Sequence, residues 1–376
     1  DILTLGAGAP ALADGTSDIT GSTLSVSGNA QSAATIGNTA ANSMTLAGGS
    51  IATNGALQSV QTASGSGGFT ASSTMTVAAP AANSTSNLTL DNNTNIASST
   101  VNDAANSMVV TADTALTSTT VAGTAPNQTY GANASLSGSA GTYVAAADYV
   151  VNNAQTVGNN AVTATATTNV WNNDGGATGQ SQFATNGIYQ STGDLSGNAT
   201  TAAAMANRST NSLTLSANSD SASAGVVNQQ VNGGAGSATA TTKADVVIAG
   251  YDAASGTDPS PVDTSSVTLN GNATTARAGG NTATNALSAS ATTFANTSVG
   301  GSVSLTGART DSVAASFAVL NEQANTGAIA AAANVTYGAS FNNLGAAPSV
   351  TNSAVALNGN SAVAVAYGNA ATNSLT

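Results

Sequence analysis

Apolar and small polar residues alternate in short runs along this chain, and the runs stop at glycine or asparagine. Leu213-Thr-Leu215 is typical, because every second side chain is apolar, as in a strand with one buried face. Glycine and asparagine tolerate the positive φ that tight turns require. The pattern predicts many short strands joined by tight corners. The 40 glycines and the abundant Asn, Ser and Thr disfavour helix.

One block of this pattern recurs along the chain with constant internal spacing. In Gly197–Leu215 the second asparagine stands nine residues after the first and the third stands four further on, before the alternating leucines. The asparagines with this spacing are Asn29, Asn38 and Asn42; Asn93, Asn102 and Asn106; Asn198, Asn207 and Asn211; Asn272, Asn281 and Asn285; and Asn360, Asn369 and Asn373. A repeated block without catalytic residue types predicts architecture.

Within a unit, the first example predicts three strands. One ends at the corner Gly28-Asn29, the second ends at Gly37-Asn38, and the third carries Met44 and Leu46 on one face. The first asparagine of each unit follows glycine in most copies, which favours a turn there. The last asparagine precedes an alternating run and favours a ladder of stacked amides inside the fold, although both sites could be turns alone.

Fainter copies lie between the clear ones. One contains Asn218, Asn228 and Asn232, and two degenerate copies reach Asn153 and Asn321, which predicts seven or eight units with variable spacers. Such repeats stack, so that each buries its face on the next. The sequence therefore predicts an all-β protein, a β-solenoid or β-helix-like repeat protein with irregular loops that polymerises into a fibre.

Three regions differ in pattern. Residues 1–22 lack the repeat and predict an N-terminal cap, or a donor strand through Ile2, Leu3 and Leu5 that adds to a neighbouring subunit. Residues 23–376 form the repeat-built part. Within it, residues 243–267 are rich in Asp and Pro and predict a loop excursion.

Composition narrows the class of protein. Charged residues make up 5% of the chain, against about 25% in globular proteins. The net charge is −12, and four scattered cations cannot form the basic stripe that nucleic acid requires. No apolar run is long enough to span a bilayer. The absence of Cys excludes a disulfide framework, and the start at Asp1 fits a mature protein whose export signal has been removed.

The same composition argues against catalysis. The chain has no His and no Cys, so it cannot build the usual nucleophile and base pairs, and we predict that it is not an enzyme. A polysaccharide lyase or hydrolase is disfavoured by the scarcity of basic residues. Asp252, Asp258 and Asp263 could bind a metal, but a solvated acidic loop explains them better. No cofactor is predicted, and calcium is the metal that scattered Asp and Asn oxygens could bind, because it tolerates irregular oxygen ligands.

The closing block GNAATNSLT and its variants resemble bacterial extracellular β-strand-repeat proteins. They are similar to curli-type fibre subunits and to the holdfast-anchor surface proteins of stalked alphaproteobacteria. They differ from curli because glutamines do not recur at fixed positions and the units are longer. The resemblance implies secretion, an extracellular location at the cell surface, and self-association, with outer-membrane anchor proteins or polysaccharide as further partners.

The predicted function is a structural subunit of an extracellular fibre in adhesion, surface attachment or biofilm matrix. Subunits would join by end-to-end strand pairing, helped by N-terminal strand donation. The main alternative is a monomeric module that binds polysaccharide or ice through threonine rows such as Thr163-Ala-Thr165-Ala-Thr167 and Thr239-Ala-Thr241. Disorder until templated is a further alternative.

Overall fold

The computed structural model shows an all-β protein built from parallel sheets. The structure describes residues 2–6, 18–20, 23–64, 67–78, 82–84, 87–117, 129–132, 143–171, 188–189, 192–249, 262–263, 266–295, 303–306, 312–342, 350–351 and 354–376. Every regular element in these ranges is a strand. The all-β class predicted from the sequence is confirmed, and the parallel pairing is compatible with a β-solenoid.

The chain passes through the same sheets in the same order several times, and we call one passage a circuit. Short corner strands lead into long strands, which lead into return strands and then into the strands of the β6 sheet. Corner strands are β3 (Thr23–Ser25), β8 (Asn87–Thr89), β15 (Thr192–Asp194), β20 (Ser266–Thr268) and β27 (Ala354–Ala356). Long strands are β4 (Ala30–Ile51), β9 (Thr94–Leu116), β16 (Ala199–Asp220), β21 (Ala273–Phe294) and β28 (Ser361–Leu375).

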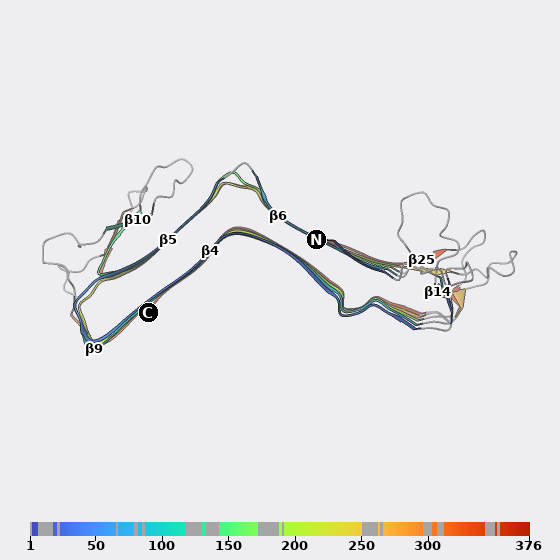
Figure 1. Cartoon of the computed structure of the whole chain (residues 1–376), viewed down its shortest axis with the longest axis horizontal. Coiled ribbons are helices and arrows are strands. Elements are labelled where there is room, and N and C mark those ends of the chain that lie inside the picture. Colours follow the sequence, from blue (N-terminus) through green and yellow to red (C-terminus); the bar gives the residue numbers. More distant parts are fainter. Residues whose placement is uncertain are drawn as a thin grey trace.

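The second half of each circuit runs back along the first. Return strands are β5 (Gly55–Ala63), β12 (Tyr149–Val157), β17 (Ala224–Asn232) and β24 (Phe317–Asn325). The β6 sheet contains β1 (Ile2–Gly6), β6 (Phe69–Ala78), β13 (Val162–Trp171), β18 (Gly236–Ala249) and β25 (Ile329–Asn342), with β2 (Asp18–Thr20), β7 (Ala82–Ser84) and β14 (Ile188–Tyr189) at its far end. Figure 1 looks along the stacking direction and shows the circuits superposed as two layers.

Stacking is in register from one circuit to the next. Asn38 pairs with Asn102, Asn102 with Asn207, and so on to Asn369, and equivalent positions of the return strands pair in the same way. The chain distance between equivalent residues is nevertheless irregular, at 64, 105, 74 and 88 residues for the third asparagine of each unit. Loops between the strands therefore absorb the variation.

One excursion sheet illustrates this tolerance. Strands β10 (Thr129–Ala132), β11 (Tyr143–Ala146), β22 (Val303–Thr306) and β23 (Ser312–Ala315) form an antiparallel sheet beside the return strands. They come from the second and fourth circuits, and they meet because the third circuit links β16 to β17 through only Ser221–Ser223. A further small pair is β19 (Val262–Asp263) with β26 (Val350–Thr351).

Each long strand is one continuous strand, which corrects the prediction of a corner at Gly37-Asn38. Side chains alternate inward and outward, but Val101 and Asn102 are consecutive and both fully buried, as are Ala206 and Asn207. Between neighbouring long strands, the residue just before the second asparagine is left out of the strand pairing in every circuit. A bulge-like change of phase bends a strand, and both layers are bent in Figure 1.

The space between the layers is filled by columns of equivalent side chains. On the side of the bend where the long strands face the β6 sheet, alanines of the long strands, such as Ala202, pack against alanines of that sheet, such as Ala164. On the other side of the bend, where the long strands face the return strands, Leu213 and the equivalent residues of neighbouring circuits pack against Val151 and Val226. Small residues thus allow two extended sheets to face each other closely.

The fainter repeat copies have a different place from the clear ones. Asn153, Asn228 and Asn321 lie on return strands, opposite the long strands that carry the clear copies. The expectation of seven or eight equivalent units is therefore corrected to five long strands and four return strands in the described residues. Of the predicted excursion at 243–267, Lys243–Ala249 belong to β18, and residues 250–261 and 264–265 lie outside the described residues.

Candidate functional site: amide ladders between the layers

The second asparagine of each unit forms a ladder at the bend. Asn102 donates from Nδ2 to Oδ1 of Asn207 at 2.8 Å, and Asn207 donates to Asn281 at 2.7 Å. The other N–H of each amide crosses to the return strand, from Asn102 to the carbonyl of Thr156 at 3.1 Å and from Asn207 to that of Val231 at 2.9 Å. Each amide therefore uses both donors and its acceptor, which removes the cost of burying it.

The third asparagine forms a second ladder that faces asparagines of the return strands. Asn106 donates to Asn211 at 2.8 Å and Asn211 to Asn285 at 2.8 Å. Across the gap, Asn228 donates to Asn321 at 2.6 Å, and its Oδ1 accepts from Asn211 at 3.3 Å. Two amide columns thus run side by side in the interior.

The first asparagine combines a turn with a ladder. The residue before it has positive φ in every copy: Gly28, Asn92, Gly197, Gly271 and Gly359. Beyond this corner, Oδ1 of Asn272 accepts both the backbone N–H and the side-chain N–H of Asn198, at 2.9 and 3.2 Å. In the same way, Oδ1 of Asn198 accepts both the backbone N–H and the side-chain N–H of Asn93 in the circuit before it. The asparagines of the five clear copies all lie in these three columns.

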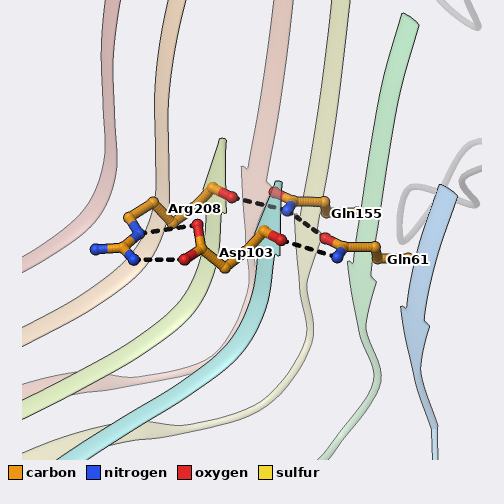
Figure 2. Close-up of polar contacts among 4 residues, drawn as sticks. All are labelled: Gln61, Asp103, Gln155 and Arg208. Carbon is orange, nitrogen blue, oxygen red and sulfur yellow. Dashed lines mark hydrogen bonds and ion pairs between the residues drawn. The ribbon is translucent and has the colours of Figure 1, made fainter. Parts of the chain in front are cut away.

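A glutamine ladder on the return strands corrects the expectation that glutamines do not recur at fixed positions, because Gln61, Gln155, Gln230 and Gln323 stand in register. Gln155 donates from Nε2 to Oε1 of Gln61 at 2.7 Å, and Gln230 donates to Gln155 at 2.7 Å. The Nε2 groups also cross to long-strand carbonyls, from Gln61 to Asp103 at 2.9 Å and from Gln155 to Arg208 at 2.8 Å (Figure 2). The sequence signal was an Asn-x-Gln pattern that recurs at Asn153, Asn228 and Asn321.

The two kinds of ladder have opposite direction. Every asparagine column donates toward later circuits, whereas the glutamine column donates toward earlier ones. Figure 2 also shows the ion pair between Arg208 and Asp103 on the outer face, with Arg208 Nε 3.0 Å from Asp103 Oδ1. The Arg208 side chain is largely exposed, so this pair contributes little to stability.

A second polar cluster lies where β16 turns into β17. The buried Asp148 carboxylate accepts the backbone N–H and the hydroxyl of Ser223, both at 2.8 Å. Nearby, Asp220 accepts the Ala222 N–H through Oδ1, while its Oδ2 has no partner among the described residues. Burial, then the charges of Asp148 and Asp220, raise the pKa of Tyr149 to about 12. Burial, opposed by the Ala222 bond, raises the pKa of Asp220, and Asp148 adds to the rise.

The remaining sequence candidates are not gathered at a site. Ile2, Leu3 and Leu5 lie on β1, which pairs in parallel with Thr74–Ala78 of β6 in the same chain, so donation to a neighbour stays a prediction. Asp252 and Asp258 lie outside the described residues, and Asp263 is on β19. Within the described ranges no three His, Cys, Asp or Glu side chains cluster as metal ligands. Those ranges also hold no helix that is long and apolar enough to cross a membrane.

The arrangement is suited to holding strands together. Primary amides do not titrate near neutral pH and are not nucleophiles, so the ladders offer hydrogen bonds and no acid–base chemistry. No family model, curated protein or solved structure matches the chain.

We predict that Asn207→Leu destabilises the protein by about 3 kcal/mol, because it keeps the side-chain volume but leaves buried partners unpaired. These partners are the Asn102 N–H, Oδ1 of Asn281 and the Val231 carbonyl. Thr210→Ala is the control, because Thr210 is exposed on the same strand and its column already contains Ala41 and Ala105. Urea unfolding followed by circular dichroism measures both; equal shifts for the two variants would contradict a stabilising ladder.

We predict that Asp220→Asn stabilises the protein at neutral pH. A raised folded-state pKa means that the folded chain holds the Asp220 proton more tightly than the unfolded chain, so stability is highest below the ordinary pKa and falls as pH rises through the folded value. The melting temperature of D220N should exceed that of the wild type at about pH 7 and match it at about pH 3. Asp113→Asn removes the same charge at an exposed position on β9 and should raise the melting temperature at neither pH. A similar increase for both variants would show that the lower net charge, and not burial of Asp220, causes the stabilisation.

Proposed function

We propose that the chain is a β-solenoid that serves as the structural subunit of a secreted bacterial fibre in adhesion, surface attachment or biofilm matrix. The observation that carries this proposal is that the same amide columns reach both ends of the stack. At the first circuit, Oδ1 of Asn42 has no donor in the described part of the chain. At the last circuit, Asn373 accepts from Asn285 at 2.9 Å and its Nδ2 has no acceptor there.

The two ends are complementary only in one orientation. A second copy seated with its β4 on β28 would set acceptors of Asn29, Asn38 and Asn42 against donors of Asn360, Asn369 and Asn373. A twofold arrangement would instead set donors against donors, or acceptors against acceptors. Head-to-tail contacts that do not close produce filaments.

Apolar side chains at the ends favour the same contact. Ile36 and Val60 in the first circuit are 64% and 56% exposed, and Leu375 in the last is 56% exposed. Stacking in the register of the sheets would bring Leu375 onto Met44, as Leu287 stacks on Leu213 inside the protein. Edge strands with unpaired backbone groups and exposed apolar side chains promote association.

The composition agrees with a polymer outside the cell. Only 5% of the residues are charged, and an extracellular polymer tolerates such a sparsely charged surface because it does not need to stay monomeric. The amides of the ladders offer hydrogen bonds rather than acid–base groups. We therefore propose a non-enzymatic role, with other copies as the main partner and outer-membrane anchor proteins or polysaccharide as further partners. The resemblance to curli-type and holdfast-anchor proteins favours the same role.

The first test is negative-stain electron microscopy of the purified chain incubated alone, which should show filaments. Asn373→Asp should raise the concentration needed for filaments by about tenfold, because it keeps the acceptor for Asn285 and replaces the outward donor by a carboxylate oxygen. Thr372→Asp makes the same charge change on the outer face of β28 and should assemble normally. Single particles from the wild type, or identical filaments from N373D, would rule out this mode of joining.

A second candidate function rests on the outer face of the β6 sheet. There, Thr163, Thr165 and Thr167 lie in register between Thr70, Ser72 and Thr74 on one side and Ser237, Thr239 and Thr241 on the other. The intervening Ala164, Ala166, Ala238 and Ala240 are buried, so the hydroxyls face outward. Parallel strand geometry spaces them about 4.8 Å across the strands and about 6.6 Å along them. Such a regular hydroxyl array favours polysaccharide or ice as a ligand.

Thr165→Lys tests this candidate, because lysine breaks the centre of the array. Co-sedimentation with insoluble polysaccharide and retention in growing ice should both be measured. We expect the wild type to bind one of the two and T165K to lose at least about tenfold in affinity, a loss of about 1.4 kcal/mol. Thr210→Lys on the opposite sheet is the control and should bind normally; absence of wild-type binding to either surface would exclude the candidate.

A further inference from the structure

A methionine on the outer face of the long strands lies beside two hydroxyl groups from later circuits. Met205 on β16 stands between the buried Ala204 and Ala206, and its own side chain is partly exposed on the opposite face. Its Sδ is 3.5 Å from Oγ1 of Thr282 on β21 and 3.9 Å from the hydroxyl of Tyr367 on β28, and both hydroxyls are placed to donate to it. The sulfur therefore joins three successive circuits.

The thioether is a poor partner for these donors. Thr282 can donate its single proton either to Sδ or to the Tyr367 hydroxyl 3.2 Å away, and the Tyr367 proton is directed at the sulfur. A thioether sulfur is only a weak acceptor, so two hydroxyl donors converge on an atom that pairs weakly with either. A stronger acceptor on the sulfur would pair with both at once.

A glycine lets the methionine and the tyrosine converge. Met205, Gly279 and Tyr367 stand in register on neighbouring strands, with the glycine in the middle. A Cβ at Gly279 would lie 2.8 Å from Cε of Met205 and 2.7 Å from Cε2 of Tyr367, so any larger residue would displace both side chains. The two side chains meet above the glycine backbone, and this contact holds the tyrosine hydroxyl near the sulfur.

The other methionines of the chain are less accessible. Met75 and Met108 are fully buried, and Met44 packs against the core of the return strands. Oxidation of methionine follows the exposure of its sulfur. Met205 is therefore the methionine that a dissolved oxidant meets first.

We propose that Met205 is an oxidation site at which methionine sulfoxide joins the three circuits more tightly than methionine does. The oxidant is a peroxide. A lone pair of Sδ attacks one peroxide oxygen, the S–O bond forms as the O–O bond breaks, and the proton of the transferred oxygen passes to the departing oxygen. Sulfur loses two electrons, and hydrogen peroxide is reduced to water.

The hydroxyls are already placed for the product. A sulfoxide oxygen is a strong acceptor that takes bent hydrogen bonds, so Thr282 and Tyr367 would reach it at about 2.7 Å from close to their present positions. Oxidation of a methionine in an apolar core disrupts packing, because it introduces a polar oxygen. At Met205 the oxygen faces two donors, so the effect on stability is reversed. The site lies within one chain and does not depend on the proposed fibre.

The test treats the full chain with hydrogen peroxide and maps the oxidised residues by mass spectrometry. Met205 should be oxidised at least about tenfold faster than Met75 and Met108. Protein oxidised at Met205 alone should melt about 2 °C above the untreated protein, because two hydrogen bonds to a strong acceptor are gained. Met205→Gln places an amide oxygen at the same point and should raise the melting temperature without peroxide.

Three variants show whether the two hydroxyls cause the rise. Thr282→Val and Tyr367→Phe each remove one donor, and they should be oxidised at Met205 as fast as the wild type but lose at least half of the rise. Thr284→Val is the matched control, because Thr284 is exposed on the same face of β21, and it should keep the whole rise.

A rise that the control keeps and the two hydroxyl variants lose supports the site. A lower melting temperature after oxidation at Met205, earlier oxidation of the buried methionines, or an equal rise in all three variants overturns it. Each of these outcomes is read on the chain itself, whether or not filaments form.

Discussion

Hydrogen bonding between buried amides is the interaction on which this structure depends. The interior is too thin and too rich in alanine for a large apolar core, and it contains many fully buried asparagines and glutamines. A buried amide without partners costs about 1–3 kcal/mol, so a random placement of these residues would unfold the chain. In-register stacking solves the problem, because each amide finds its partner in the identical side chain one strand away. The ladder therefore selects the register, and the register fixes the sheets.

The bend shows how the ladders act across the layers as well as along them. Where the long strand changes phase, Asn207 reaches the Val231 carbonyl, and in return Gln155 reaches the Arg208 carbonyl. Each layer thus supplies an acceptor for the amides of the other. This reciprocal bonding ties two bent sheets together at the place where packing of small side chains alone would hold them least.

The sequence predicted part of this arrangement, and the limits have physical causes. Asn29, Asn38 and Asn42 and their equivalents were found because every long strand keeps one spacing. The corner at Gly37-Asn38 was wrong, because a Gly-Asn pair marks a turn and a change of strand phase equally well. The return strands were taken for degenerate copies, because Asn153, Asn228 and Asn321 follow insertions whose lengths carry no information about which layer a strand occupies. The bond from the Gln61 side chain to the Asp103 backbone carbonyl could not be predicted from a sequence pattern, since every residue type carries the same backbone carbonyl.

The opposite donor directions of the asparagine and glutamine ladders restrict how strands can pair, in addition to stabilising the stack. Between β17 and β24, the asparagine of the earlier strand donates to that of the later strand, whereas the glutamine of the later strand donates to that of the earlier one. A plain edge strand pairs with any extended backbone, which is why exposed edges aggregate. Neighbouring strands that must also match a donor to an acceptor at one position, and an acceptor to a donor two residues later, exclude most other registers, because a mismatched amide would be buried unpaired. The polar ladders that stabilise the interior therefore also fix which strand lies beside which.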